Sequence, residues 1–165
     1  MCDCSGTLNF TNEFGNVFVT ANICPFCGLS GSTVTFESKV EESAFTFSSD
    51  FVCKPSCIFS DDQALLGTSG QGTATTLAGD SFPLIFTLEL VHTTAGDTFN
   101  IFLISFDFII LFFGIPVVAP NELTITDCNS TSIQTSTNTS LTKNNIANGF
   151  SPTRKIFING KWQDL

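Results

Sequence analysis

The chain has 165 residues, a length that fits one domain with one hydrophobic core. Only 13% of the residues are charged, and 15 acidic residues against 6 basic ones give a net charge of -9. Because this charge repels phosphate groups and anionic lipid headgroups, we expect a protein that does not bind nucleic acid.

The first seven residues are small and polar apart from Cys2 and Cys4. We expect residues 1–7 to form a flexible arm, or connector, in front of a single domain that spans residues 8–165. The same stretch lacks the basic and apolar segments of a secretory signal peptide, so we expect a protein without a classical export signal.

Alternation of apolar and polar residues then predicts strands over 16–23, 32–40 and 44–52. The link between the last two is short, which predicts a hairpin. On the third strand, Phe45, Phe47 and Phe51 are expected to share one face. The two neighbouring strands should therefore present aromatic side chains to the same side of the sheet.

Residues 60–78 are rich in Gly, Ser, Thr and Gln around the single apolar pair Leu65-Leu66. Such a composition is typical of a loop. We expect an irregular segment here, with one turn of helix over 61–66 that Asp61 would cap.

Strands return over 83–92, 98–106, 108–118 and 121–127, with a hairpin turn at Ala95-Gly96. The run from 99 to 120 approaches the length of a membrane span. However, Asp107, Gly114 and Pro116 interrupt it and no basic residues flank it, so we expect two β-strands and no insertion into a membrane. Strands that are apolar on both faces need cover on both, which favours a second subunit against one face.

The last forty residues are mostly polar. Residues 129–150 consist largely of Ser, Thr and Asn and predict a polar edge strand or a loop, whereas 154–165 suit a terminal strand or hairpin. Eight or more short strands without a convincing amphipathic helix predict an all-β fold. The specific expectation is an antiparallel β-sandwich of jelly-roll type behind a flexible cysteine-bearing arm.

The seven cysteines are the strongest candidates for a functional site, and six of them come as close pairs. Cys24-Pro25-Phe26-Cys27 resembles one knuckle of a zinc ribbon, and Cys53 and Cys57 offer a second knuckle with one extra residue. Zinc is therefore the alternative cofactor, although no metal or other cofactor is favoured.

Structural disulfides are the favoured interpretation of these cysteines. Six cysteines can close three bridges in any of about fifteen connectivities, and the seventh then stays free or crosses to another chain. Cys2 and Cys4 on the arm, together with the isolated Cys128, are the candidates for bridges between subunits. Cys24, Cys27, Cys53 and Cys57 remain candidates for disulfides or, alternatively, for zinc.

Catalytic chemistry finds little support in the sequence. His92 is the only imidazole, and it ends an apolar strand with no nucleophile motif nearby. We expect a ring held in a hydrogen bond at the end of a strand, and a protein that is not an enzyme.

The plan of the chain resembles the self-assembling β-sandwich subunits of the bacterial spore surface, particularly endospore appendage subunits. The resemblance rests on Met1-Cys2-Asp3-Cys4, on the missing signal peptide, on Cys24 and Cys128 in or beside strands, and on the polar faces of the strands. It implies pilus-like fibres formed by strand addition between subunits, with Cys2 and Cys4 as covalent staples. The chain departs from that plan in its close pairs Cys24/Cys27 and Cys53/Cys57 and in its longer polar tail.

The sequence thus predicts a structural protein that assembles with itself outside the cell or on a spore or cell surface, with disulfides between subunits. One alternative is a small zinc-binding or ligand-binding β-sandwich module. Another is a capsid-like protein with a jelly-roll fold.

Overall fold

The computed structural model describes residues 1–40, 44–105, 109–117, 122–129, 155–158 and 161–164. These residues form an all-β fold in which the one helix is the short 3-10 helix η1 (Pro25–Cys27), between β2 and β3. The strands are β1 (Cys4–Thr11), β2 (Val17–Ile23), β3 (Thr33–Ser38), β4 (Phe45–Val52), β5 (Ser56–Phe59), β6 (Gln63–Thr76), β7 (Ser81–Thr93), β8 (Gly96–Ile104), β9 (Ile109–Val117), β10 (Leu123–Asp127), β11 (Lys155–Ile158) and β12 (Lys161–Asp164).

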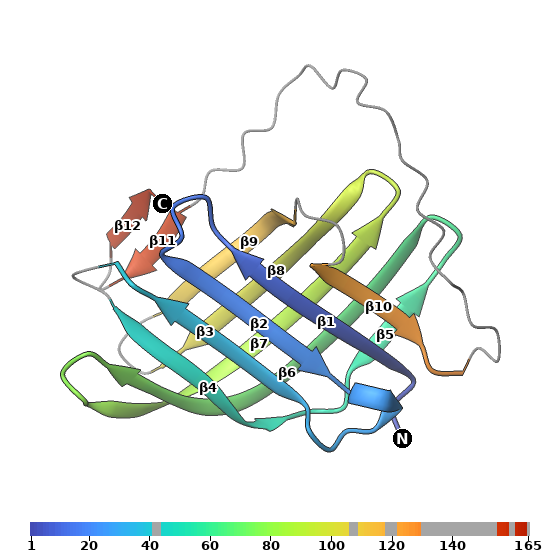
Figure 1. The fold of residues 1–165 in the computed structure, drawn as a ribbon, viewed down its shortest axis with the longest axis horizontal. Coiled ribbons are helices and arrows are strands. Elements are labelled where there is room, and N and C mark those ends of the chain that lie inside the picture. The colour runs from blue at the N-terminus through green and yellow to red at the C-terminus, as the bar shows by residue number, and fades with distance from the viewer. Residues whose placement is uncertain (41–43, 106–108, 118–121, 130–154, 159–160, 165) are drawn as a thin grey trace.

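Ten strands form one antiparallel sheet in the order β10-β1-β2-β3-β4-β6-β7-β8-β9, with β5 paired to β6 beyond the end of β4. The sheet is so strongly curved that it is nearly barrel-shaped, and β10, β1, β2 and β3 cross in front of β6, β7, β8 and β9 (Figure 1). Most strands lie beside the next strand in the sequence, and β10 returns to pair with β1. The all-β antiparallel class is therefore confirmed, whereas the jelly-roll arrangement is not.

The core lies between the two crossing halves of the sheet. Alternate side chains point inward, as in β7, where Leu84, Phe86, Leu88 and Leu90 are buried. Aromatic rings close the gap between the halves: Phe10 of β1 lies 4.9 Å from Phe99 of β8, measured between ring centroids. Because successive side chains of a strand point to opposite faces, this alternation places apolar side chains in the core inside the curved sheet and polar ones on its outer surface.

The segment that was expected to be a loop is the longest strand of the sheet. β6 runs from Gln63 to Thr76 and pairs with β4, β5 and β7. Two of its glycines are needed for packing: a Cβ on Gly70 would lie 2.6 Å from the ring of Phe86, and one on Gly72 would lie 2.7 Å from the ring of Phe47. The glycines that suggested a loop therefore provide the space that two core phenylalanines fill.

The expectation of a flexible N-terminal arm is also wrong. From Cys4 onward the segment is strand β1, which is paired on both sides, with β2 and with β10. Cys2 and Cys4 are 1% and 0% exposed. Gly6 permits a close approach of β1 to the opposite half of the sheet, because a Cβ there would lie 2.8 Å from Cδ1 of Leu66. Cys2 and Cys4 thus belong to the core of the domain.

The long apolar run forms the two antiparallel strands β8 and β9, as the sequence predicts. Asp107, expected at their junction, lies outside the described residues. Within the described part of the chain there is no helix with the length and apolar character needed to cross a bilayer.

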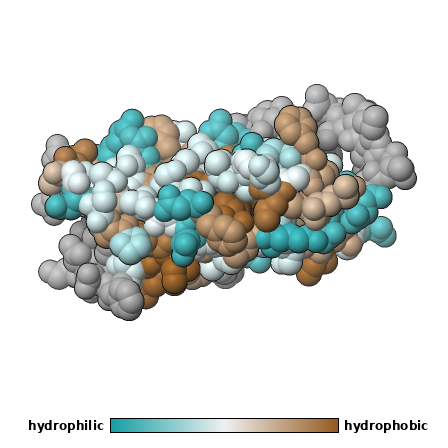
Figure 2. Space-filling view, turned by 90° about the horizontal axis from the view of Figure 1, so that it is seen from below, coloured by the Kyte–Doolittle hydropathy of each residue, from teal (hydrophilic) through white to brown (hydrophobic). Residues whose placement is uncertain are grey.

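One outward row of the sheet is apolar and partly exposed. Ile85, Ile104 and Ile109 are direct neighbours on β7, β8 and β9, with exposed fractions of 60%, 38% and 46%. Phe51, expected to share a face with Phe47, points outward instead, because the pairing of β4 with β6 shifts between Ser49 and Phe51. Figure 2 shows apolar side chains reaching the surface among hydrophilic ones.

The C-terminal segment is described only in part. Two short strands, β11 and β12, form an antiparallel hairpin, which confirms the predicted terminal hairpin, and β11 lies against β9. The polar segment expected over 129–150 falls, except for residue 129, outside the described residues.

Candidate functional site

Six of the seven cysteines form three disulfides at one end of the sheet. Cys2 is bonded to Cys24, Cys4 to Cys57 and Cys27 to Cys128, with Cα atoms 6.2, 6.4 and 5.8 Å apart. The bridges link the start of β1 to the loop after β2, to β5 and, through that loop, to the end of β10. In Figure 1 the N-terminus and the 3-10 helix lie together at this end.

The loop at the centre of the cluster has an unusual backbone. Cys24, Phe26 and Cys27 have positive φ angles of 51°, 54° and 61°. This conformation costs a non-glycine residue about 1–2 kcal/mol. It also turns the ring of Phe26 fully into solvent. The two disulfides at Cys24 and Cys27 hold a loop that local preference would not maintain.

Hydrogen bonds tie the same loop to β1 and β10. The N–H of Cys2 donates to the carbonyl of Cys27 over 2.9 Å, and the N–H of Cys128 donates to the carbonyl of Asp3 over 2.9 Å. Inside the loop, the N–H of Cys24 donates to Oγ of Ser32 over 2.9 Å. These bonds hold the loop and the end of β10 against the start of β1, where the bridges Cys2–Cys24 and Cys27–Cys128 close.

The three cysteines that were expected to link subunits are all bonded within the chain. Cys2 and Cys4 are held inside because the supposed arm is part of the sheet, and Cys128 follows β10, which pairs with β1. Of the proposed zinc quartet, Cys24, Cys27 and Cys57 each belong to a different bridge. The described residues contain no group of three or more side chains placed to hold a metal ion.

Cys53 is the one cysteine without a disulfide, and it lies half-buried between β4 and β5. Its backbone is fixed by β6: its N–H donates to the carbonyl of Ser69, and its carbonyl accepts from Oγ1 of Thr68, each over 2.8 Å. The thiol is therefore carried by a well-anchored segment directly before a short outer strand.

His92 lies at the end of the hairpin formed by β7 and β8, outside the cysteine cluster. Its Nδ1 is 2.6 Å from Oδ1 of Asp97, and its ring is largely exposed. A histidine with its ring in a hydrogen bond at a strand end is the arrangement that the sequence predicts.

The register of β7 and β8 also brings together two residues that the sequence analysis did not single out. Glu89 and Asn100 are direct partners, and Nδ2 of Asn100 donates to a carboxylate oxygen of Glu89. Counting outward in pairs from the hairpin turn would have placed them opposite each other. The signal was present, but neither residue belongs to a recognisable motif.

The chemistry of the cysteine cluster is covalent reinforcement: three bridges close loops over 22, 53 and 101 residues. Comparison of the chain with protein-family models, with curated proteins and with solved structures found no match.

Proposed function

We propose that the chain is a structural subunit that assembles with copies of itself into an extracellular fibre or layer, by adding strands at an open edge of its sheet. The observation that supports this proposal best is the exposed edge strand β5. Disulfides in a chain of this size are typical of proteins that work in an oxidising environment, which agrees with an extracellular site of action.

β5 pairs with β6 along one edge, and no described strand bonds to its other edge. Ile58 and Phe59 are 65% and 42% exposed, and as consecutive residues they lie on opposite faces of the strand. Natural proteins usually protect such an edge with charged residues, proline or a covering segment. The four residues of β5 contain neither charge nor proline, which suits an edge that receives a strand from a second copy.

Two further apolar features are suited to contacts between copies. One is the outward row Ile85, Ile104 and Ile109, and the other is Phe26 on its disulfide-held loop. A contiguous exposed apolar surface favours association, and a rigidly held side chain loses little entropy when it is buried.

Because Cys2, Cys4 and Cys128 are bonded within the chain, we propose Cys53 as the cysteine that links two copies. Cys53 retains a free thiol and is separated from β5 by two residues, so a strand added at the edge of β5 would lie close to it. We therefore propose a strand-to-strand contact that a disulfide through Cys53 reinforces.

Assembly can be tested with the purified, oxidised chain at about 100 μM by light scattering, electron microscopy and gel electrophoresis with and without reductant. We expect polymers to form. The double variant Ile58→Lys with Phe59→Lys should abolish them, because two charges would have to be buried in the contact at the edge of β5. Leu77→Lys is the matched control, since Leu77 is 82% exposed in a turn away from β5. A chain that stays monomeric at this concentration contradicts the proposal.

The same experiment can separate the role of the thiol from that of the edge. Cys53→Ser should leave the polymers in place but remove the dimer band from a non-reducing gel. A zinc assay on the monomer tests the alternative of a metal-binding module. A zinc-loaded monomer that oxidation leaves unchanged would favour that alternative.

A further inference from the structure

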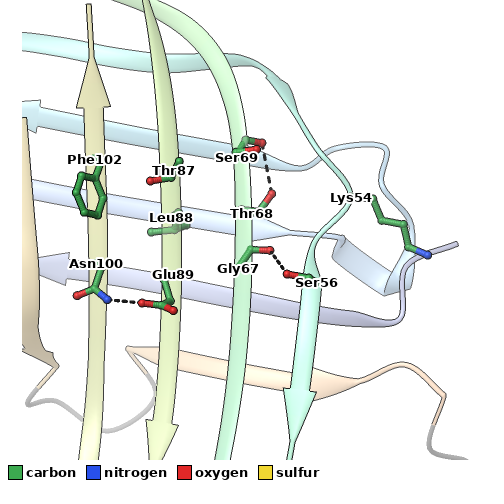
Figure 3. Close-up of a pocket in the computed structure, with 10 residues that line it drawn as sticks. All are labelled: Lys54, Ser56, Gly67, Thr68, Ser69, Thr87, Leu88, Glu89, Asn100 and Phe102. Carbon is green, nitrogen blue, oxygen red and sulfur yellow. Dashed lines mark hydrogen bonds between the residues drawn. The ribbon is translucent and has the colours of Figure 1, made fainter. Parts of the chain in front are cut away.

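The outer surface of the sheet contains an open groove that the cysteine cluster does not use. It encloses about 600 Å³ and lies over β5, β6, β7 and β8. Ser56, Gly67, Glu89 and Asn100 form one lateral row, in which Gly67 contributes no side chain. The missing side chain leaves a depression between Ser56 on one side and Glu89 on the other (Figure 3).

A carboxylate and an amide meet at one end of this groove. Asn100 is 91% buried although it occupies an outward position, and it donates a hydrogen bond to Glu89. Glu89 is only partly exposed and makes no ion pair with any described residue. The bond from Asn100 fixes the carboxylate, which retains lone pairs that can accept hydrogen bonds from a ligand.

An aromatic ring lies beside this pair. Phe102 follows Asn100 by two residues on β8, so both side chains lie on the same face of the strand, and Phe102 is directly opposite Thr87 on β7. Phe102 is partly exposed and has no aromatic partner among the described residues. Its ring can therefore pack against an apolar face of a ligand.

Hydroxyl groups complete the lining. Ser69 and Thr87 are neighbours on β6 and β7, and neither side chain hydrogen-bonds to another described residue. Oγ of Ser56 makes a 3.4 Å bond to the carbonyl of Gly67. Each hydroxyl can both donate and accept a hydrogen bond, so the groove presents uncharged groups of both kinds around one carboxylate.

The charge of the groove narrows the class of ligand. Lys54 is the only basic residue among those that line it, and its Nζ lies 2.9 Å from a carboxylate oxygen of Asp3. With that charge matched, Glu89 and the net charge of -9 disfavour acidic ligands. A neutral sugar fits the rest: its hydroxyls match the carboxylate of Glu89 and the hydroxyl groups, and its C–H face matches the ring of Phe102.

We propose that this groove binds a neutral saccharide of one or two rings, with Glu89, held in place by Asn100, accepting hydrogen bonds from its hydroxyls and Phe102 packing against a ring face. This inference does not rest on self-assembly, because every residue in the groove belongs to one copy of the chain. A polymer of the chain would carry one such site on each copy.

The test is a glycan array of neutral and acidic saccharides, followed by calorimetry of the full chain with the best neutral ligand as a free disaccharide. We expect binding to neutral glycans with a Kd of about 1 mM or tighter. Glu89→Gln should weaken binding by about tenfold or more, because a hydrogen bond to a charged acceptor is lost. Phe102→Ala should also weaken it, by about fivefold to tenfold.

Two matched variants outside the groove serve as controls. Glu37→Gln removes a carboxylate on the outer face of β3, and Phe51→Ala removes a largely exposed ring on β4. Both should change the Kd by less than about twofold, and a circular-dichroism melt of each variant shows whether it is folded. Three results would overturn the proposal. The first is that the chain binds no glycan, and the second is that it binds only acidic glycans or the cations choline and arginine amide. The third is that the control variants weaken binding as much as the groove variants do.

Discussion

One end of this sheet and its middle are held by different kinds of interaction. At the end that carries β5 and the start of β1, three disulfides and a strained loop fix the strands. In the middle, where β4, β6 and β7 run side by side, the strands are fixed by aromatic rings packed over glycines. The difference shows that one small domain can combine two kinds of stabilisation. Disulfides act where the cysteines meet, and close packing acts where glycines face phenylalanine rings.

The largest effect is expected in the packed region, from Gly72→Val. The new side chain would collide with the ring of Phe47, which is 2.7 Å from the position of a Cβ, and with the backbone carbonyl of Ser48. Because the backbone cannot move aside cheaply, the free energy of unfolding should fall by more than about 5 kcal/mol. Urea unfolding followed by circular dichroism measures this change.

A control for this prediction lies in the same strand. Gly67→Ala places a Cβ 3.5 Å from Oγ of Ser56, an ordinary contact distance. This substitution should change the free energy of unfolding by less than about 1 kcal/mol. If both substitutions cost the same, the glycines of β6 are not needed for ring packing.

The next largest effects concern the disulfide-linked end. Replacing Cys27 and Cys128 by alanine opens a loop of 101 residues and should cost about 4.7 kcal/mol by loop entropy. Replacing Cys2 and Cys24 opens a loop of 22 residues and should cost about 3.4 kcal/mol. Unfolding of both double variants in guanidinium measures the difference; the reverse order would show that the strained loop, and not loop length, dominates.

A smaller effect is expected from a single ring in the packed region. Phe47 is 2% exposed and its ring lies 5.8 Å from that of Phe86. Phe47→Ala should therefore cost about 3 kcal/mol, within the range for a buried phenylalanine. A cost below about 1 kcal/mol in urea unfolding would mean that this part of the core is not closely packed.

The smallest effect should come from the ion pair between Lys54 and Asp3 at the disulfide-linked end. Both side chains are at least half exposed, so solvent screens their attraction although the atoms are 2.9 Å apart. Lys54→Ala should change the free energy of unfolding by less than about 0.5 kcal/mol. A larger loss of free energy of unfolding, measured by thermal unfolding, would mean that this ion pair contributes to the stability of the disulfide-linked end.

Strands with strict alternation were predictable from the sequence. In β3, Val34 and Phe36 alternate with threonine and glutamate, and the structure keeps this pattern from Thr33 to Ser38. β6 was missed because Gly70 and Gly72 have the propensity of a loop, and only the rings that cover them explain their presence. β1 was missed because its start is short and polar, and its pairing with β10 joins residues more than a hundred positions apart.

The site was less predictable than the fold. The count of seven cysteines correctly indicated disulfides, but which thiols meet depends on the return of β10 to β1, and local sequence does not contain that information. The groove depends on the register of three strand pairs, which places Gly67 between Ser56 and Glu89. Single residues without a motif become a site only when that register is known.

The bridge from Cys27 to Cys128 also sets an order of events during synthesis. Cys27 leaves the ribosome about a hundred residues before its partner, and in the meantime its nearest thiol is Cys24, three positions away. A bond between these two neighbours would have to be exchanged before both native bridges could form. Correct oxidation of this chain therefore requires either that its thiols stay reduced until β10 is made, or that an early bond remains accessible to thiol exchange.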